Sequence, residues 1–297
     1  MRYVAIPDLH LGKRFNVSYG NASIAEAFSL RLVIDIIKKE NTKDTTFIFL
    51  GDIFERSRPD YHTIFNFLKL LHRTNASIVI TGNHDIPKVN HQSVMDYLGD
   101  FVTVVQKNTS HCINDEHYAI GWCDTQGIFE KTLKQVLCKK PTTVFLHAAY
   151  NNLENLNDNV VPDVMIKVAK KQGTILVSGH EHTHNIHSDT LIHTGSIMPF
   201  NIGELGKKYY WTSDNGLVEI NHGVGSSEED DLIITREEIE SQGTKPIMIR
   251  TKARSSDKLV LEKQSLSVDI MDVFKIEALA EGFDETFIEK YLDDFQD

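Results

Sequence analysis

Five short segments of the chain hold side chains that can bind divalent cations, and each stands beside a glycine or at the end of an apolar run. They are Asp8-Leu9-His10, Gly51-Asp52, Gly82-Asn83-His84-Asp85, Leu146-His147-Ala148 and Gly179-His180-Glu181-His182. Carboxylates, imidazoles and one amide oxygen together suit a pair of divalent ions. The set contains no cysteine, which weakens the case for a structural zinc site. The five segments predict a two-metal hydrolase that acts on a phosphate ester.

The residue types suggest how two ions would be shared. A carboxylate at Asp52 can bridge them, with one oxygen to each, and Asn83 offers a neutral amide oxygen. His147 and His180 would supply imidazole to one ion, and His182 to the other. This mixture of oxygen and nitrogen ligands favours Mn²⁺, with Fe or Zn²⁺ as alternatives, over Ca²⁺ and Mg²⁺. Two such ions would lower the pKa of a bridging water and neutralise charge on the phosphate oxygens.

Two further residues of the third segment are predicted to be catalytic. His84 can face the leaving oxygen, either as a general acid or as an electrostatic stabiliser of the transition state, and Asp85 can hold its other ring nitrogen. The remaining histidines are interpreted as structural or surface residues with no part in the chemistry. They are His62, His72, His91, His111, His117, His184, His187, His193 and His222.

Each segment needs a strand that delivers it to the site. Short runs rich in Val, Ile, Phe and Thr predict buried strands at Tyr3–Pro7, Thr45–Leu50, Ala76–Thr81, Thr142–His147 and Thr174–Ser178. Apolar residues at three-to-four spacing predict helices at Ala22–Glu40, Asp60–Arg73, Gln126–Leu137 and Pro162–Lys170. The alternation predicts an α/β sheet with helices on its faces, and ligand sites form at the carboxyl ends of such strands.

After about Gly179 the pattern changes to shorter strands, as in antiparallel structure. These are predicted at Asn185–His187, Thr190–His193, Lys208–Thr212 and Leu217–Asn221. The polar stretch Gly223–Asp231 is predicted to be a linker. Beyond it, Pro246–Arg250 and Lys258–Glu262 are predicted to pair as strands, followed by helices at Met271–Ala280 and Glu285–Phe295.

Composition sets limits on function. The chain has 297 residues, of which 41% are hydrophobic, and no apolar run approaches the roughly 20 residues needed to cross a bilayer. Three cysteines at irregular spacing predict neither a disulfide framework nor a zinc ribbon, and favour a reducing cytoplasm, that of a bacterium or of a host cell if the source is viral. The net charge of −11 argues against polyanion binding over the whole surface. Local basic groups remain at Lys13-Arg14, at Arg56 with Arg58, at Lys207-Lys208 and from Lys245 to Arg254.

The ordered blocks Asp-x-His, Gly-Asp, Gly-Asn-His-Asp, a later His and Gly-His-x-His resemble those of the calcineurin-like metallophosphoesterase superfamily, over roughly residues 1 to 200. The resemblance implies an α/β (α+β) fold, a four-layer β-sandwich flanked by helices. It also implies one metal site of Asp8, His10, Asp52 and His182, and a second of Asp52, Asn83, His147 and His180. Many members have Gly where this chain has Leu146.

Three blocks are similar to those of the SbcD-type DNA-repair exonucleases, the nuclease subunits that work with SMC-like ATPases. They are Asp8–Gly12, Gly51–Pro59 and His193–Glu204. Some relatives carry a substrate-touching His where this chain has Glu55. The resemblance implies DNA as substrate and a role in repair or recombination.

The resemblance also suggests a division of the chain. We expect a catalytic domain over residues 1–225 and a small α/β appendage over residues 226–297. Residues 232–262 would be a reduced cap over DNA, and Met271–Phe295 would dock onto an SMC-like ATPase partner; packing of the last helix on the chain's own core is an equal alternative. A homodimer stays open, as do exo- versus endonuclease action and strand preference.

Two other functions compete with the nuclease. One is a phosphoesterase acting on a small molecule or phosphoprotein, which the acidic net charge favours. The other is a non-catalytic scaffold, which is disfavoured because every metal-ligand block is present.

Overall fold

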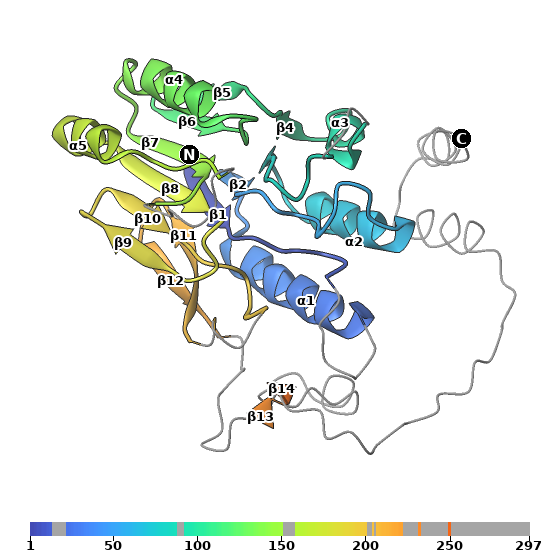
Figure 1. The fold of residues 1–297 in the computed structure, drawn as a ribbon. Coiled ribbons are helices and arrows are strands. Elements are labelled where there is room, and N and C mark those ends of the chain that lie inside the picture. Colours follow the sequence, from blue (N-terminus) through green and yellow to red (C-terminus); the bar gives the residue numbers. More distant parts are fainter. Residues whose placement is uncertain are drawn as a thin grey trace, which may run out of the picture. The chain divides into compact units, whose positions relative to one another are not determined.

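Two six-stranded sheets form the frame of the protein (Figure 1). The structure is a computed structural model, and it describes residues 1–13, 22–87, 92–150, 158–200, 204, 206–221, 231–232 and 249–250. Five helices accompany the sheets in the described residues: α1 (Ala22–Glu40), α2 (Tyr61–His72), α3 (Val94–Leu98), α4 (Gln126–Leu137) and α5 (Asp163–Gln172).

The first sheet has the strand order β12-β11-β1-β2-β3-β4. Its members are β1 (Arg2–Ile6), β2 (Thr45–Phe49), β3 (Ser77–Ile80), β4 (Thr103–Val105), β11 (Lys208–Thr212) and β12 (Gly216–Ile220). Strands β1 to β4 run parallel, so their carboxyl ends meet at one edge, while β11 returns antiparallel beside β1. The chain therefore comes back to its first strand after completing the second sheet.

The second sheet has the strand order β5-β6-β7-β8-β10-β9. Its members are β5 (Ser110–Asn114), β6 (His117–Ile120), β7 (Thr143–His147), β8 (Ile175–Gly179), β9 (Asn185–His187) and β10 (Leu191–His193). The inner strands β6, β7, β8 and β10 run parallel, and the edge strands β5 and β9 are antiparallel to their neighbours. The carboxyl ends of β7 and β8 thus also share an edge.

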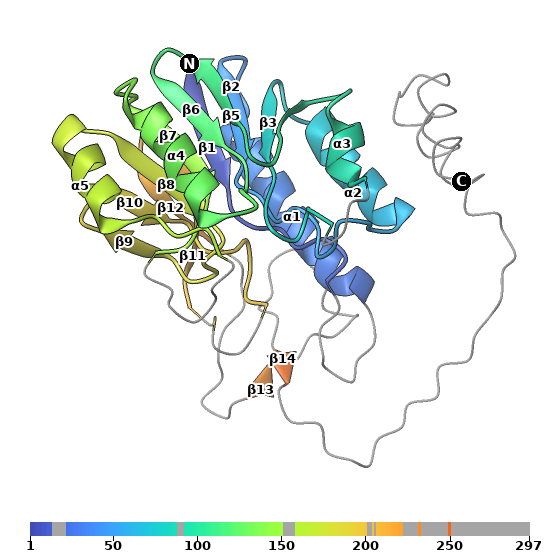
Figure 2. The same ribbon diagram turned by 45° about the horizontal axis from the view of Figure 1, so that its top comes forward.

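The two sheets pack face to face around one apolar core. Tyr3, Ile48 and Ile78 of the first sheet share this core with Phe145 and Val177 of the second. Outside the sandwich, α1, α2 and α3 lie on one side and α4 and α5 on the other (Figures 1 and 2). The predicted four-layer sandwich is confirmed, and each sheet has helices on only one face because the other sheet covers the second.

Helix boundaries agree closely with the sequence pattern, because local caps mark them. The side chain of Asp60 accepts a hydrogen bond from the amide of Thr63 at the start of α2, and Thr125 accepts one from Ile128 at the start of α4. At the end of α5, Gly173 adopts a left-handed φ of 74°, a conformation that glycine takes without a Cβ penalty. The strands β2 and β7 are buried throughout, as their unbroken apolar runs predict.

Several elements escaped the sequence pattern. The edge strand β5 and its neighbour β6 are short and partly exposed, and β4 has three residues, so none carries a strong apolar run. Strand β14 (Ile249–Arg250) pairs with β13 (Asp231–Leu232), at the end of the predicted linker. Its expected partner, Lys258–Glu262, and the expected docking helices of Met271–Phe295 lie outside the described residues.

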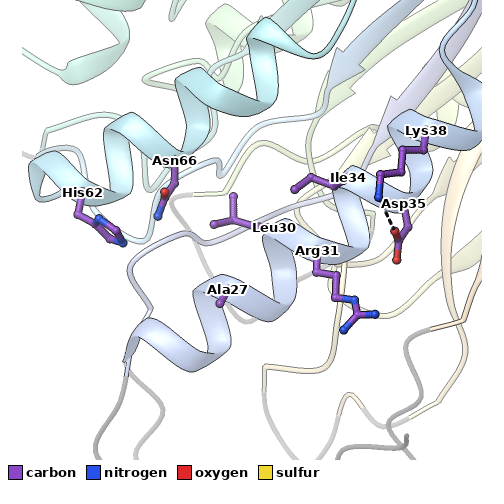
Figure 3. Close-up of a pocket in the computed structure, with 8 residues that line it drawn as sticks. All are labelled: Ala27, Leu30, Arg31, Ile34, Asp35, Lys38, His62 and Asn66. Atoms are coloured by element: carbon purple, nitrogen blue, oxygen red, sulfur yellow. Dashed lines mark ion pairs between the residues drawn. The ribbon is translucent and has the colours of Figure 1, made fainter. Parts of the chain in front are cut away.

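A groove of about 500 Å³ lies between α1 and α2 (Figure 3). Leu30 and Ile34 contribute apolar surface from α1, and His62 and Asn66 contribute polar groups from α2. None of the predicted metal ligands lines this groove. The candidate chemistry therefore has to be sought at the strand ends.

Candidate metal centre

All seven predicted ligands follow or end strands whose carboxyl ends share one edge of the sandwich. Asp8 and His10 follow β1, Asp52 follows β2, Asn83 follows β3, His147 ends β7, and His180 and His182 follow β8. Parallel strands deliver their carboxyl ends to a common edge, as ligand sites in α/β sheets require. The sandwich brings the ends from both sheets together.

The backbone at three of these ligands is strained. His10, Asp52 and His180 have φ values of 44°, 47° and 81°, which residues with a Cβ seldom adopt. Such conformations cost roughly 1–3 kcal/mol each and cluster at functional sites, where the surrounding fold holds them. Here all three residues with positive φ directly follow or lie close to the end of a strand that leads to the candidate centre.

The first ligand group consists of Asp8, His10 and His182, which each offer one ligand atom within 4.8 Å of the others. The two Nε2 atoms of His10 and His182 are 2.9 Å apart, and Nε2 of His182 lies 3.9 Å from Oδ2 of Asp8. Both rings therefore direct the same nitrogen at one point, together with a carboxylate. Two nitrogens and an oxygen around one point suit a transition-metal ion.

The second group consists of Asp52, His147 and His180, again with ligand atoms within 4.8 Å of one another. Asn83 joins it, because its Oδ1 lies 3.1 Å from Nε2 of His147 and 3.1 Å from Nδ1 of His180. The amide oxygen therefore faces the same point as the two imidazoles. The predicted second ligand set is gathered in one place.

Asp52 connects the two groups through a single oxygen. Its Oδ2 lies 3.3 Å from Nε2 of His147 and 3.6 Å from Nε2 of His10. Its Oδ1 instead accepts a hydrogen bond of 2.9 Å from the amide of His84. That each oxygen serves one ion stays a prediction; here Oδ2 is the oxygen that faces both groups, and Oδ1 also accepts the hydrogen bond from the backbone.

Each histidine ligand has an outer partner that sets its ring orientation. Glu55 Oε2 lies 2.8 Å from Nδ1 of His10, and Glu204 Oε1 lies 2.9 Å from Nδ1 of His182. Such carboxylate partners fix the tautomer and direct the opposite nitrogen toward a metal. Glu55, which stands where some relatives have a substrate-touching His, is therefore a positioning residue in this chain.

The second group has outer partners of the same kind. Nδ1 of His147 donates to the carbonyl oxygen of Leu50 at 2.7 Å, which leaves Nε2 as the ligand atom. Nε2 of His180 lies 3.4 Å from Oδ2 of Asp158, within ion-pair range but not as a hydrogen bond, and its Nδ1 faces Asn83. Sequence reasoning missed Asp158, because no motif or spacing connects it to His180.

The environment of the buried Asp8 carboxylate shows whether this site is suited to cations. Asp8 is fully buried, and its Oδ1 has no hydrogen-bond partner among the described residues. A buried unpaired carboxylate oxygen is costly unless a cation or donor satisfies it. Gly82 and Gly179 lie so close that an added Cβ would collide with Asp52 and Asp8, respectively. The donor types and the close packing around Asp8 and Asp52 fit a pair of divalent cations.

Without cations, protons compensate the buried charge. Burial raises the pKa of Asp8. Burial acts to raise the pKa of Asp52 too, but His147 outweighs it and lowers that pKa well below its usual value. For His147 burial acts to lower the pKa, but Asp52 and Asp8 raise it to about 9. A proton on Nε2 of His147 thus occupies the direction in which a cation would bind.

His84 lies beside the two groups, at the edge of the His10 ring, with ring centroids 4.8 Å apart. Its Nδ1 donates to the carbonyl oxygen of Glu55 at 3.0 Å, because a carbonyl can only accept. The expectation that Asp85 holds this nitrogen is wrong. Asp85 is fully buried and accepts hydrogen bonds from the amides of Phe54 and Gly82 at 3.0 and 2.9 Å. It joins the loops after β2 and β3.

Lys208 is a buried positioning residue that sequence reasoning placed on the surface. It is 1% exposed, and its Nζ donates to the carbonyl oxygen of His182 at 2.8 Å and to Oγ of Ser196 at 3.0 Å. Burial lowers the pKa of Lys208 to about 8. The basic group expected at Lys207-Lys208 therefore reduces to Lys207, which pairs with Glu219 at 2.7 Å.

A sandwich of two sheets with two groups of candidate cation ligands at one edge is the arrangement expected of a metal-dependent hydrolase. The chain belongs to the calcineurin-like phosphoesterase family, whose sequence profile matches residues 1–188. The family predicted from the ordered motifs is confirmed. In the described residues, no helix combines the length and apolar character needed to cross a membrane.

One curated relative is similar to part of the chain. The chain is 31% identical over 131 residues to the DNA double-strand break repair protein Mre11 of Methanococcus maripaludis. The alignment covers 41% of this chain and 34% of that protein, so the chain matches about a third of the relative's length.

Two solved structures are similar at low identity. One is TT1561 of Thermus thermophilus, with a TM-score of 0.42, 12% identity, and coverage of 70% of this chain and 92% of that one. The other is phosphopantetheinyl hydrolase (PptH) from Mycobacterium tuberculosis, with a TM-score of 0.37, 14% identity, and coverage of 66% and 89%.

Proposed function

We propose that the protein is a two-metal phosphodiesterase that hydrolyses DNA. The observation that carries the two-metal part is the position of Asp52 Oδ2, 3.3 Å from a ligand nitrogen of one group and 3.6 Å from a ligand nitrogen of the other. One oxygen shared by two ligand groups is suited to hold two ions a short distance apart. When bound, two divalent ions would activate water, orient the phosphate and neutralise charge that develops on its oxygens.

Residues of the chain would hold the ions, position the ligands and supply a proton to the leaving group. Asp8 and Asp52 supply the negative charge that retains the ions, and the outer partners Glu55 and Glu204 keep His10 and His182 aimed. His84 has its Nδ1 proton committed to the carbonyl of Glu55, so Nε2 is the nitrogen left for substrate. When Nε2 is protonated, it can give that proton to the leaving oxygen as the P–O bond breaks and the water oxygen bonds to phosphorus.

DNA as the substrate is supported by sequence relationship rather than by charge. The aligned relative is a DNA double-strand break repair protein. The block His193–Glu204 gives weaker support than its motif suggests, because Glu204 contacts Nδ1 of His182 and the amide of Phe200. Glu204 therefore supports His182 of the candidate metal centre, a role that does not depend on DNA as the substrate.

The alternative is a phosphoesterase for a small molecule or phosphoprotein. It is favoured by the net charge of −11 and by the pairing of Lys13, the lysine nearest His10 in the sequence, with Glu55 at 3.1 Å. A DNA-binding surface needs several cations directed at phosphates.

The test compares two phosphodiesters under Mn²⁺. The full chain is assayed on end-labelled duplex and single-stranded DNA and on bis-p-nitrophenyl phosphate. We expect cleavage of both, and loss of both in His180→Ala but not in His184→Ala, a matched histidine in the same loop between β8 and β9 and outside both groups. Cleavage of the small ester alone would exclude the nuclease.

The proposal also includes a protein partner for the C-terminal residues. We propose that residues 271–295 bind an SMC-like ATPase subunit. Co-purification of the full chain with such a subunit, lost on deletion of these residues while Mn²⁺-dependent ester hydrolysis remains, is the expected result. Analytical sedimentation of the full chain alone would report a homodimer.

A further inference from the structure

A second cluster of metal-binding side chains lies beside the metal centre and uses none of its ligands. Glu181, His187 and His193 each offer one ligand atom within 4.8 Å of the others. They come from the loop after β8 and from the two strands of the β9–β10 hairpin, which adjoins β8 (Figure 1). Sequence reasoning assigned chemistry to none of the three.

The hairpin register explains why the two histidines meet. His187 pairs with Leu191, and His193 is two residues further along the same strand. Residues two apart on a strand share a face, so His187 and His193 are diagonal neighbours on one side of the hairpin. Their ring centroids are 5.4 Å apart. Glu181 reaches them because β8 and β10 are paired in parallel.

The hydrogen bonds around His193 leave a nitrogen lone pair directed into this cluster. Its side chain is 0% exposed, and Nε2 donates to the carbonyl oxygen of Ala148 at 2.9 Å. A carbonyl cannot donate, so Nε2 carries the proton and Nδ1 carries the lone pair. Nδ1 is buried without a hydrogen-bond partner among the described residues, and it lies 3.7 Å from Oε2 of Glu181.

The other two members also have a ligand atom to spare. Nε2 of His187 is buried and unpartnered within the described part of the chain. Glu181 uses Oε1 to accept a 2.6 Å hydrogen bond from the amide of Tyr150, which leaves Oε2 for the cluster. Two buried nitrogens with no partner are costly unless something satisfies them. A single cation would satisfy both, together with the free carboxylate oxygen.

We propose that Glu181, His187 and His193 form a third metal site, separate from the two-cation centre, that binds Zn²⁺. Two imidazoles and one carboxylate are a known zinc donor set, and tetrahedral zinc leaves one position for water. The site joins the β9–β10 hairpin to the loop that carries His180 and His182. Its role is to hold that loop in place.

The test counts zinc in the full chain, which is stripped with a chelator, loaded with Zn²⁺, gel-filtered and analysed for metal. The informative variant is His193→Gln, because the glutamine amide can still donate to Ala148 while the lone pair at Nδ1 is lost. His184→Gln is the control: its ring packs on Tyr209, and it is outside the cluster. We expect His193→Gln to bind one equivalent less than the wild type, and His184→Gln to bind the same amount.

A second background separates this site from the catalytic pair. In a chain carrying Asp52→Asn and His147→Ala, we expect one tightly held zinc to remain, and His187→Gln or Glu181→Gln to remove it. We also expect Zn²⁺ to raise the melting temperature of this background and not that of the background with His187→Gln. Equal zinc content in the wild type, His193→Gln and His187→Gln, with all three folded by circular dichroism, would overturn the proposal whatever the activity on DNA.

Discussion

The glycine at the end of β8 offers a sharp test of the metal centre. A Cβ added at Gly179 would lie 2.8 Å from the carbonyl oxygen of Leu50 and 3.1 Å from Nδ1 of His147, and closer still to Oδ1 of Asp8. Ordinary contact begins at 3.4 Å. The backbone of Gly179 is not in the left-handed region, so the effect of Gly179→Ala would be steric alone.

The size of the effect follows from what has to move. Relief of the contact with Leu50 alone requires a displacement of more than half an ångström, and the contact with Asp8 requires more. The movement would separate ligands on the first sheet from His180, which follows Gly179 directly. A misplacement of about 1 Å in a catalytic site costs roughly 10²-fold in rate. We expect Gly179→Ala to lose about that factor in kcat and to bind less metal.

The assay is Mn²⁺-dependent hydrolysis of bis-p-nitrophenyl phosphate, with metal content measured on the same samples. Gly127→Ala is the matched control, because a Cβ at that position in α4 would meet nothing within 4 Å. In a helix this change stabilises by up to about 1 kcal/mol, so it should raise the melting temperature and leave turnover unchanged. A Gly179→Ala chain with two bound ions and wild-type kcat would refute the geometry.

Three further predictions concern the same candidate metal centre, and one concerns the burial of Cys123. His84→Ala should keep both metals and lose roughly 10²–10⁴-fold in turnover, as expected for loss of a general acid. Asp52→Asn should reduce the metal content of both groups, because the shared oxygen loses its charge. Metal binding to the chelator-stripped chain should release a proton and weaken as pH falls below about 9. The reason is that burial acts to lower the pKa of His147, but Asp52 and Asp8 outweigh it and raise that pKa to about 9. Calorimetry in buffers of different ionisation enthalpy measures the proton release. Burial raises the pKa of Cys123 to about 11, so iodoacetamide at pH 8 should label the two exposed cysteines and spare Cys123 until the chain is unfolded.

Each of these has a distinct contrary result. Unchanged turnover in His84→Ala would remove that residue from the mechanism. Two full equivalents of metal in Asp52→Asn would contradict the shared oxygen. Metal binding with no proton release at pH 7 would show that His147 is already neutral in the stripped chain. Labelling of Cys123 at the rate of the exposed thiols would contradict its burial.

Much of the fold could be predicted because its signals are local. The bounds of α1 and α4 agree with their apolar spacing, and the cap at Thr125 is encoded within three residues of the helix start. The strands β2 and β7 follow from unbroken apolar runs. Strand β5 could not be predicted in this way, because it is a partly exposed edge strand with no fully buried residue and no apolar run.

The sequence by itself determined the types and order of the candidate metal ligands, because each candidate is within a few residues of a strand end and a strand end is a local property. Only the tertiary structure decided which oxygen of Asp52 faces both groups, what Asp85 bonds, and that Lys208 is buried. Only the hairpin register brought His187 and His193 to Glu181. These outcomes depend on contacts between segments far apart in the chain, whose distances and directions are set by sheet pairing and packing and have no counterpart in residue spacing.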